Sequence, residues 1–329
     1  MSLAKPAAPR LNRVALVLLL AVSAVLAGAD APRLPTFHWC VTGPDPLRID
    51  LRGTPIRDDA VIFYEHDFGL LPRFWKGKPE RGGVPQAANM PAHLAKLRLD
   101  IEKQIPDPNW AGYGIIDLEA WGPLWEYAVE EAHQMSISIA RRNHPDRPQH
   151  EVERIARANY ELGARSLLEK TLRDCKAIRP KAKWGFYNWP NPAHEPRLKE
   201  LNWLWDATTA FFPVCYTVYK SSPNGKHADG CAPREEFRST TSLAVECSRR
   251  VAGPDRPVIA LVWVRYHEIN PVFGHQFLEA ADLEQMLRVP IDAGADGLVF
   301  WDAIGTEQLA NEYRRYLADH LTPTLRRFQ

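Results

Sequence analysis

The 329-residue sequence predicts an α/β fold, a distorted (β/α) barrel of the TIM type with about seven strands. Short strand-like segments alternate with longer helical segments along most of the chain. The most apolar of these short segments are hydrophobic on both faces, as expected for parallel strands covered by helices. Several of them end in a polar or aromatic residue, and in barrels of this type the chemistry takes place where the strands end.

The first 29 residues are predicted to be a secretory signal peptide. Three basic residues precede an almost entirely apolar run at 14–27, and small residues at 27–29 offer a cleavage site. The run is too short for a comfortable transmembrane helix, although an uncleaved membrane anchor is the alternative. We therefore expect a single domain at 30–329, exported to the extracellular space or the periplasm, with no stable membrane insertion.

Charge and cysteine content exclude several classes of protein. Removing the signal peptide shifts the formal net charge from +1 to −2, so no global positive field remains to attract nucleic acid. The odd number of cysteines leaves at least one unpaired, and neither they nor the histidines show the spacing of a zinc site. No nucleotide-binding or serine-hydrolase motif is present. We therefore expect neither a metal nor a cofactor. The cysteines are Cys40, Cys175, Cys215, Cys231 and Cys247.

In the first half of the chain, strands are expected at 36–39, 60–65 and 113–119. The segment at 60–65 reads AVIFYE and is rich in strand-forming residues. Apolar residues then recur at helical spacing in 93–105. Two long helices are expected at 124–142 and 151–178, separated by the sequence Asn-His-Pro-Asp, which interrupts helices.

In the second half, strands are expected at 183–188, 210–216, 257–264 and 297–301. The segment at 257–264 reads PVIALVWV and is apolar throughout, which favours a fully buried strand. Helices are expected at 198–208, 234–251, 283–293 and 305–321, the last of them amphipathic. A helix therefore follows most of the strands, which is the pattern of a (β/α) barrel.

An acidic pair ends the third expected strand. Side chains alternate faces along a strand, so Asp117 and Glu119 project to the same side, roughly 6–7 Å apart. Like charges this close raise one pKa, which keeps one acid protonated near neutral pH while the other stays anionic. Cleavage of a glycosidic bond needs such a pair. The alternative is a strand that simply runs out into solvent with two polar residues at its end.

The segment around this pair, YGIIDLEAWGPLW, resembles the signature of the hyaluronidases of glycoside hydrolase family 56, in which an Asp-x-Glu strand is followed by Trp. Further matches occur in the same order along the chain and together cover roughly residues 35–320. They are IFY (62–64), GGVPQ (82–86), HPDRP (144–148), GARSLLEKTL (163–172), WGFY (184–187), WLWDATTAFFPVCY (203–216) and GADGLVFW (294–301).

The resemblance implies a retaining endo-β-N-acetylhexosaminidase in which the N-acetyl carbonyl of the substrate is the nucleophile. Glu119 would be the general acid and base, and Asp117 would hold the acetamido group. Tyr187 and Tyr216 match tyrosines near the acetamido group and the cleavage point. Substrate assistance of this kind is a known departure from the scheme with two catalytic carboxylates.

Four aromatic residues are predicted to bind the substrate: Tyr64, Trp121, Tyr266 and Trp301. Tyr64 matches a tyrosine of the cleft floor, and Trp301 matches the tryptophan that walls the −1 sugar. The expected partner is hyaluronan, chondroitin or a related amino-sugar polymer, cleaved by a monomeric enzyme.

The chain also departs from the family pattern. Gly122 replaces an arginine, Cys40 replaces an asparagine, and His267 stands where the family has Asp. Pro192 replaces a cysteine, so the two core disulfides of the family cannot form in their usual places, and no cysteine-rich C-terminal module is present. Loss of this arginine weakens the case for a substrate in which an anionic glucuronate adjoins the N-acetyl sugar. Two alternatives therefore stay open: a hydrolase of an uncharged N-acetylglucosamine polymer, and a catalytically silent carbohydrate-binding relative.

Overall fold

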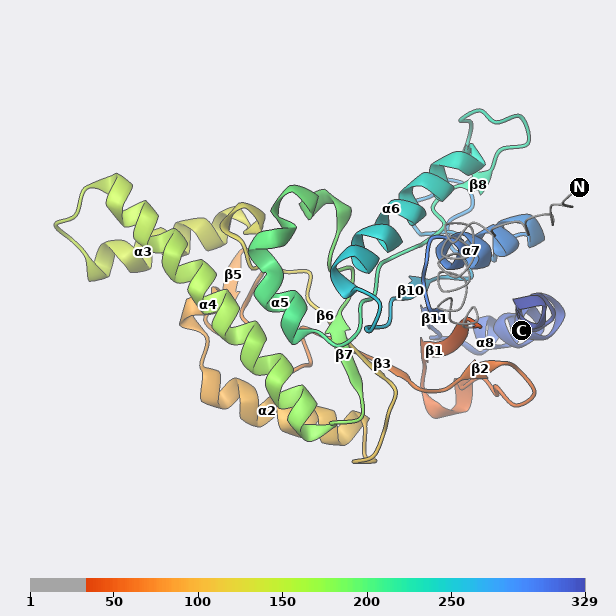
Figure 1. Cartoon of the computed structure of the whole chain (residues 1–329), viewed down its shortest axis with the longest axis horizontal. Helices are drawn as coiled ribbons and strands as arrows, with labels where there is room; N and C mark the ends of the chain where they lie inside the picture. Colours follow the sequence, from red (N-terminus) through yellow and green to blue (C-terminus); the bar gives the residue numbers. More distant parts are fainter. Residues whose placement is uncertain (1–33, 329) are drawn as a thin grey trace, which may run out of the picture. The chain divides into compact units, whose positions relative to one another are not determined.

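Two parallel β-sheets form the centre of the computed structural model, which describes residues 34–328. The predicted signal peptide lies outside these residues. The strands are β1 (Thr36–Thr42), β2 (Ile56–Arg57), β3 (Ala60–Tyr64), β6 (Tyr113–Asp117), β7 (Lys183–Phe186), β10 (Ile259–Val262) and β11 (Gly297–Ala303). One sheet has the order β3–β6–β7 and the other β10–β11–β1–β2 (Figure 1).

A short extended segment at 211–214 connects the two sheets. Three isolated parallel bridges hold it, namely Tyr187–Phe212, Phe211–Val258 and Val214–Leu261. With this segment, seven parallel segments follow one another in the order β3, β6, β7, 211–214, β10, β11, β1. Within residues 34–328 no ladder pairs β1 with β3, so the ring is open there. The predicted α/β class is confirmed, and the number of parallel segments agrees with the prediction.

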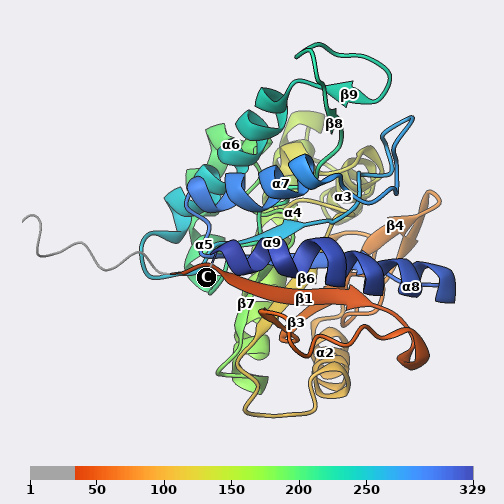
Figure 2. The same ribbon diagram turned by 90° about the vertical axis from the view of Figure 1, so that its right-hand side faces the viewer.

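Helices pack around these strands. They are α2 (Met90–Gln104), α3 (Glu130–Asn143), α4 (Gln149–Ile178), α5 (Asn202–Ala207), α6 (Arg234–Ala252), α7 (Ala280–Asp292), α8 (Glu307–Tyr316) and α9 (Thr322–Leu325). In Figure 1, α3 and the long α4 extend together away from the strands. Figure 2 shows α8 and α9 lying alongside β1, where Tyr313 packs edge-on against Trp39.

Close backbone approach fixes the packing of β6 against β7. Trp184 of β7 is completely buried, and a Cβ atom at position 114 of β6 would lie 2.3 Å from its ring. Only glycine leaves room for the indole there. Gly114 therefore allows the strand that carries Asp117 to sit directly on the apolar core.

Two of the predicted strands differ from the structure in ways that affect the site. The strand expected at 210–216 is reduced to isolated bridges, because Pro213 has no N–H group to continue a ladder. The strand expected at 113–119 ends at Asp117, so Glu119 lies in the loop that follows β6.

Several helix boundaries also differ. The helix predicted at 124–142 begins only at Glu130, after a 3-10 turn at Trp125–Tyr127. Its N-terminal part is instead fixed by a tertiary contact, because the Glu161 side chain accepts a hydrogen bond from the backbone N–H of Trp125. The helix predicted at 198–208 is a 3-10 segment, Pro192–Leu201, followed by α5.

Two pairs of short strands were not predicted: β4 (Arg73–Trp75) with β5 (Lys78–Glu80), and β8 (Lys220–Ser221) with β9 (Cys231–Ala232). The five cysteines all lie within the described residues, and no disulfide bond joins any two of them. No helix in the described part of the chain is long and apolar enough to span a bilayer.

Candidate active site

A cleft of about 460 Å³ lies where the parallel segments end. Tyr64 and Asp117 are the last residues of β3 and β6 and stand opposite each other in the register of the two strands. Tyr187 follows β7 directly, and Trp263 follows β10 in the same way. Because neighbouring parallel strands end at the same edge, residues far apart in the sequence meet in this cleft.

The acidic pair lies in this cleft. Asp117 is half-buried, whereas Glu119 is exposed to solvent. Burial, with the charges of Glu119 and Glu65 beside it, raises the pKa of Asp117 to about 7. Burial and the charge of Glu65 also raise the pKa of Glu119. The sequence suggested one raised pKa; the structure raises both, because both carboxyls are partly desolvated and a third carboxylate stands next to the pair.

That third carboxylate belongs to Glu65, which follows β3 directly. Its Oε2 accepts hydrogen bonds from the backbone N–H groups of Glu119 (3.1 Å) and Ala120 (2.9 Å). Carboxylates bind backbone N–H groups more strongly than neutral acceptors do. Glu65 therefore fixes the loop that carries Glu119, although this loop lies outside the strand.

Replacing Glu65 with Gln should shift the pH–activity profile toward lower pH. The amide oxygen of Gln can still accept the two N–H bonds, but the negative charge is gone. Without this charge the pKa values of Asp117 and Glu119 both fall. The proton donor then loses its proton at a lower pH, and the alkaline limb of kcat/KM moves in the same direction.

The matched control is Asp67→Asn, which removes an exposed charge near Glu65 and should leave the profile in place. An active Glu65→Gln enzyme with an unchanged alkaline limb would contradict the assigned electrostatic role.

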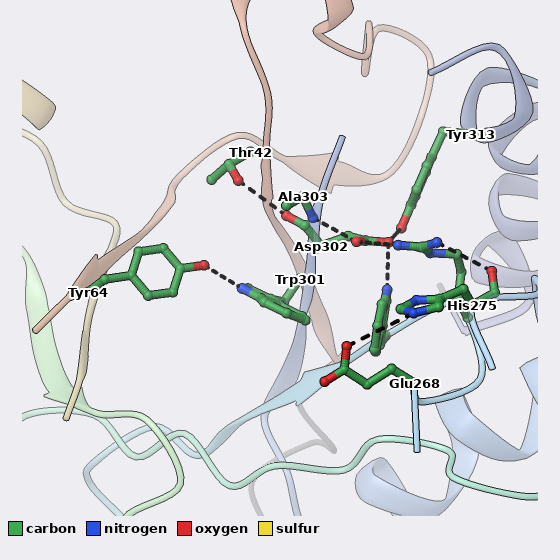
Figure 3. Close-up of polar contacts among 10 residues, drawn as sticks. Thr42, Tyr64, Glu268, His275, Trp301, Asp302, Ala303 and Tyr313 are labelled. Carbon is green, nitrogen blue, oxygen red and sulfur yellow. Dashed lines mark hydrogen bonds and ion pairs between the residues drawn. The ribbon is translucent and has the colours of Figure 1, made fainter. Parts of the chain in front are cut away.

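Aromatic side chains form one wall of the cleft. The rings of Tyr216 and Trp301 stack with their centroids 5.7 Å apart, and Trp263 meets Trp301 edge-on at 5.3 Å. The Trp301 indole N–H donates a hydrogen bond to the Tyr64 hydroxyl, 3.0 Å away (Figure 3). Flat aromatic faces of this kind suit the apolar face of a sugar ring.

A buried ion pair supports this wall from behind. The carboxylate of Asp302, which follows Trp301 in β11, is 2% exposed and binds Arg265 through two hydrogen bonds of 2.7 Å. The same carboxylate accepts hydrogen bonds from the Trp263 indole N–H at 2.5 Å and from the Tyr313 hydroxyl. Figure 3 shows Asp302 and Tyr313 on the side of Trp301 away from Tyr64. Asp302 therefore holds Trp263 in place.

Replacing Asp302 with Ala should lower the free energy of unfolding by about 3–5 kcal/mol, because the buried Arg265 would lose its partner. Denaturant unfolding measures the loss. Asp58→Ala is the control, since it breaks an ion pair with Arg48 in which both side chains are more than half exposed. The control should cost less than about 1 kcal/mol, and an equal loss in both variants would contradict the role given to Asp302.

Six of the eight predicted site residues line the cleft: Tyr64, Asp117, Glu119, Tyr187, Tyr216 and Trp301. Trp121 lines a smaller hollow beside Glu119 instead; it is 4% exposed, and its indole N–H donates a hydrogen bond to the Pro72 carbonyl oxygen. Tyr266 is not a cleft residue. It is 1% exposed, and its hydroxyl donates to Asp282, 2.5 Å away.

Sequence reasoning missed six other cleft residues: Ile62, Glu65, His66, Trp263, His267 and Glu268. Glu65 and Trp263 both adjoin expected strand ends, which was the available signal. His267 and Glu268 were considered only as a departure from a family pattern. Within residues 34–328 no cluster of three or more histidine, cysteine or acidic side chains could hold a metal ion.

Two further hollows adjoin the cleft. The first, of about 220 Å³, shares Glu119 and Tyr187 with the cleft; we call it the Trp189 hollow. Its other lining residues include Gly122, Tyr127, Asn188, Trp189 and Asn191. The second, of about 330 Å³, shares Tyr216 and His267 with the cleft and is otherwise lined mainly from β8, β9 and α6. Each hollow therefore adjoins the cleft at a different pair of lining residues.

An acidic pair at the strand ends of a (β/α) fold, facing aromatic rings that suit a sugar, is the arrangement of a glycoside hydrolase. Comparison with known proteins specifies the family. The hyaluronidase family model matches residues 51–329. The chain therefore belongs to the hyaluronidase family.

Individual relatives agree with this assignment. The chain is 27% identical over 295 residues to a hyaluronidase of Apis mellifera, with 82% of this chain and 74% of that protein covered. It is 29% identical over 290 residues to hyaluronidase-1 of Homo sapiens (80% and 64% covered). It is 30% identical over 266 residues to a chondroitin hydrolase of Caenorhabditis elegans (73% and 55% covered). The match thus spans less than two thirds of the last two proteins.

Solved structures show the same fold. The crystal structure of bee venom hyaluronidase superposes with a TM-score of 0.74 at 25% identity, covering 88% of this chain and 99% of that one. A second crystal structure of the bee enzyme, in complex with a hyaluronic acid tetramer, gives a TM-score of 0.76 at 24% identity. Both belong to an enzyme with the same fold as this chain.

Proposed function

We propose that the protein hydrolyses β-N-acetylhexosaminidic bonds inside hyaluronan, chondroitin or a related glycosaminoglycan. The observation that carries this proposal is a buried polar atom in the cleft, Asp117 Oδ1, which has no hydrogen-bonding partner among the described residues and lines the same cleft as Tyr216. Buried polar atoms without a partner are costly and rare, so a ligand is expected to satisfy them.

An acetamido group has the matching chemistry. Its N–H can donate to Asp117, and its carbonyl oxygen can accept from the Tyr216 hydroxyl. Burial and the neighbouring Tyr187 hydroxyl raise the pKa of Tyr216 well above its usual value, so this hydroxyl keeps its proton and remains a donor. Together the two groups would hold the acetamido group in a fixed orientation beside the anomeric carbon.

In the first step, the acetamido carbonyl oxygen attacks the anomeric carbon while the glycosidic C–O bond breaks. Glu119 donates its proton to the leaving oxygen, and anionic Asp117 stabilises the positive charge that develops on the oxazolinium ring. In the second step, Glu119 takes a proton from water, and the hydroxide adds to the anomeric carbon and restores the acetamide. Two inversions give net retention of configuration.

The raised pKa values fit this division of roles. Asp117 and Glu119 stand close to Glu65, and their pKa values are raised. The carboxyl groups therefore titrate as a coupled system, in which each ionised group makes the next ionisation less favourable. One proton is therefore retained toward neutral pH. Glu119 is the better donor to a substrate, because it is exposed to the cleft while Asp117 is half-buried.

Cleavage inside the polymer is supported by the two hollows. A chain that passes through the cleft can continue into the Trp189 hollow on one side and into the hollow beside Tyr216 on the other. A site that is open at both ends accepts internal bonds. The names of the bee, human and nematode relatives support a glycosaminoglycan as substrate. The predicted signal peptide supports export, where such polymers are encountered, and we propose a monomer.

The purified protein, incubated with hyaluronan and with chondroitin, tests this proposal. Hydrolysis should give saturated oligosaccharides, whose masses include one added water for each bond cleaved, with N-acetylhexosamine at the new reducing end. Unsaturated products would indicate elimination and would contradict the proposed chemistry. Binding of these polymers without any cleavage would favour the carbohydrate-binding alternative.

A further inference from the structure

The Trp189 hollow lies beyond the proton donor. Glu119 lines both this hollow and the cleft, whereas Asp117, Tyr216 and Trp301 line the cleft and do not line this hollow. If the cleft holds the N-acetyl sugar, Glu119 stands beside the oxygen that joins it to the next sugar. The hollow on the other side of Glu119 is therefore the place for the sugar that leaves.

The lining of the Trp189 hollow is aromatic and amide-rich. Tyr127 and Trp189 are both half-buried and provide rings, and Asn188 and Asn191 provide side-chain amides. The Asn191 oxygen already accepts a hydrogen bond from the N–H of Ala193, so its NH2 group is what it offers to a ligand. Rings with a few amide groups suit the face and the hydroxyls of a sugar.

The depth of the hollow depends on glycine at position 122. A Cβ atom there would lie 2.7 Å from Cβ of Tyr127 and 3.4 Å from the Trp189 ring. Any side chain at this position would press on both rings that enclose the hollow. Gly122 therefore keeps space between them, and the resulting volume of about 220 Å³ suits one sugar ring.

No basic side chain lines the hollow. All its lining residues are described, and among them Glu119, Tyr127 and Tyr187 are the ionisable ones. Arg197 is close enough to Tyr127 to affect its pKa, but it is paired with Glu126 (2.9 Å) and with Glu200. The carboxylate of a uronic acid placed here would lose water without gaining a cation as its partner, whereas a neutral sugar carries no such penalty.

We propose that the Trp189 hollow binds the leaving-side sugar through its ring face and its neutral groups, so that the enzyme also hydrolyses uncharged N-acetylhexosamine polymers. This inference rests on the proposed function, because it takes Glu119 as the proton donor. The reaction is the same hydrolysis: the glycosidic C–O bond breaks, and water supplies the hydroxyl group and the proton.

The first test compares substrates on the full chain. Oligomers of β-1,4-linked N-acetylglucosamine and hyaluronan oligosaccharides of equal length are assayed side by side. We expect kcat/KM on the neutral oligomer to be at least equal to that on hyaluronan and to change little as NaCl is raised. A chain that cleaves hyaluronan but not the neutral oligomer overturns this inference and leaves the proposed function standing. A chain that cleaves neither contradicts both.

The second test uses paired substitutions at Trp189. Trp189→Leu keeps apolar bulk without a flat ring, and Trp189→Phe keeps the ring. Each variant is assayed on the neutral oligomer and on the glycosyl fluoride of the same donor sugar, which places no sugar in the hollow. The oligomer-to-fluoride ratio of kcat/KM should fall about ten-fold in Trp189→Leu and recover in Trp189→Phe.

The matched control is Trp75→Leu, at an exposed tryptophan in β4 that lines neither the cleft nor the hollow. The oligomer-to-fluoride ratio of kcat/KM in Trp75→Leu should equal that of the unsubstituted protein. An unchanged ratio in Trp189→Leu would overturn the assignment of the hollow to the leaving sugar. If neither Trp189 variant folds, the comparison of kcat/KM on the neutral oligomer and on hyaluronan still tests the inference.

Discussion

Replacing Glu119 with Gln should lower kcat on the preferred polymer by about 10²–10⁴-fold, the usual contribution of general acid–base catalysis. The amide has nearly the shape of the protonated acid but cannot give up a proton to the leaving oxygen or take one from water. Glu65 binds the backbone N–H of residue 119 rather than its side chain. The loop should therefore keep its position, and substrate binding should persist.

Steady-state kinetics on hyaluronan or chondroitin, together with a binding assay, measure this effect. Glu102→Gln is the control, because it makes the same change on the exposed side of α2 and should leave kcat unchanged. Activity of the Glu119 variant within a few-fold of the original would show that another group donates the proton.

Replacing Asp117 with Asn should lower kcat almost as far, by about 10²–10³-fold, because a neutral amide cannot stabilise the positive oxazolinium ring. The loss should be specific to N-acetylated substrates. Glu119 should still act as an acid, but with a lower pKa, since the charge of Asp117 no longer opposes its ionisation.

The same substitution has an expected effect on stability. The pKa of Asp117 rises from 3.8 to about 7 in the folded chain, so between these pH values the folded state binds more protons than the unfolded state. Stability is therefore lost as pH rises through this range. Asn cannot ionise, so Asp117→Asn should be at least as stable as the original protein at pH 7. A variant that is clearly less stable at pH 7 than at pH 4, relative to the original, would contradict the burial argument.

The acidic pair could be found from sequence because its two members are neighbours on the chain, at the end of an apolar strand. The aromatic residues Tyr64, Tyr187 and Trp301 could be found for a similar reason, since each ends or closely follows a recognisable strand. In a parallel sheet the strand ends converge whatever the loops do. Local patterns and the common direction of the strands therefore predict half of the residues that line the cleft.

Long-range polar contacts could not be found in this way. The bond from Glu65 to the N–H of Glu119 joins residues 54 positions apart, and that between Arg265 and Asp302 joins residues 37 apart. Nothing in either segment specifies the partner. The position of Tyr266 could not be found from the sequence for a related reason: β10 ends at Val262, and the Tyr266 hydroxyl reaches Asp282 instead of the cleft.

The stereochemistry of the first product tests the central claim most directly. Proton NMR spectra recorded during the first minutes of hyaluronan-oligosaccharide cleavage distinguish the anomers of the new reducing-end N-acetylglucosamine before they interconvert. Attack by the acetamido carbonyl, followed by water, inverts the anomeric carbon twice, so the β-anomer should appear first. Initial release of the α-anomer would mean that water attacks directly, and would contradict the substrate-assisted mechanism.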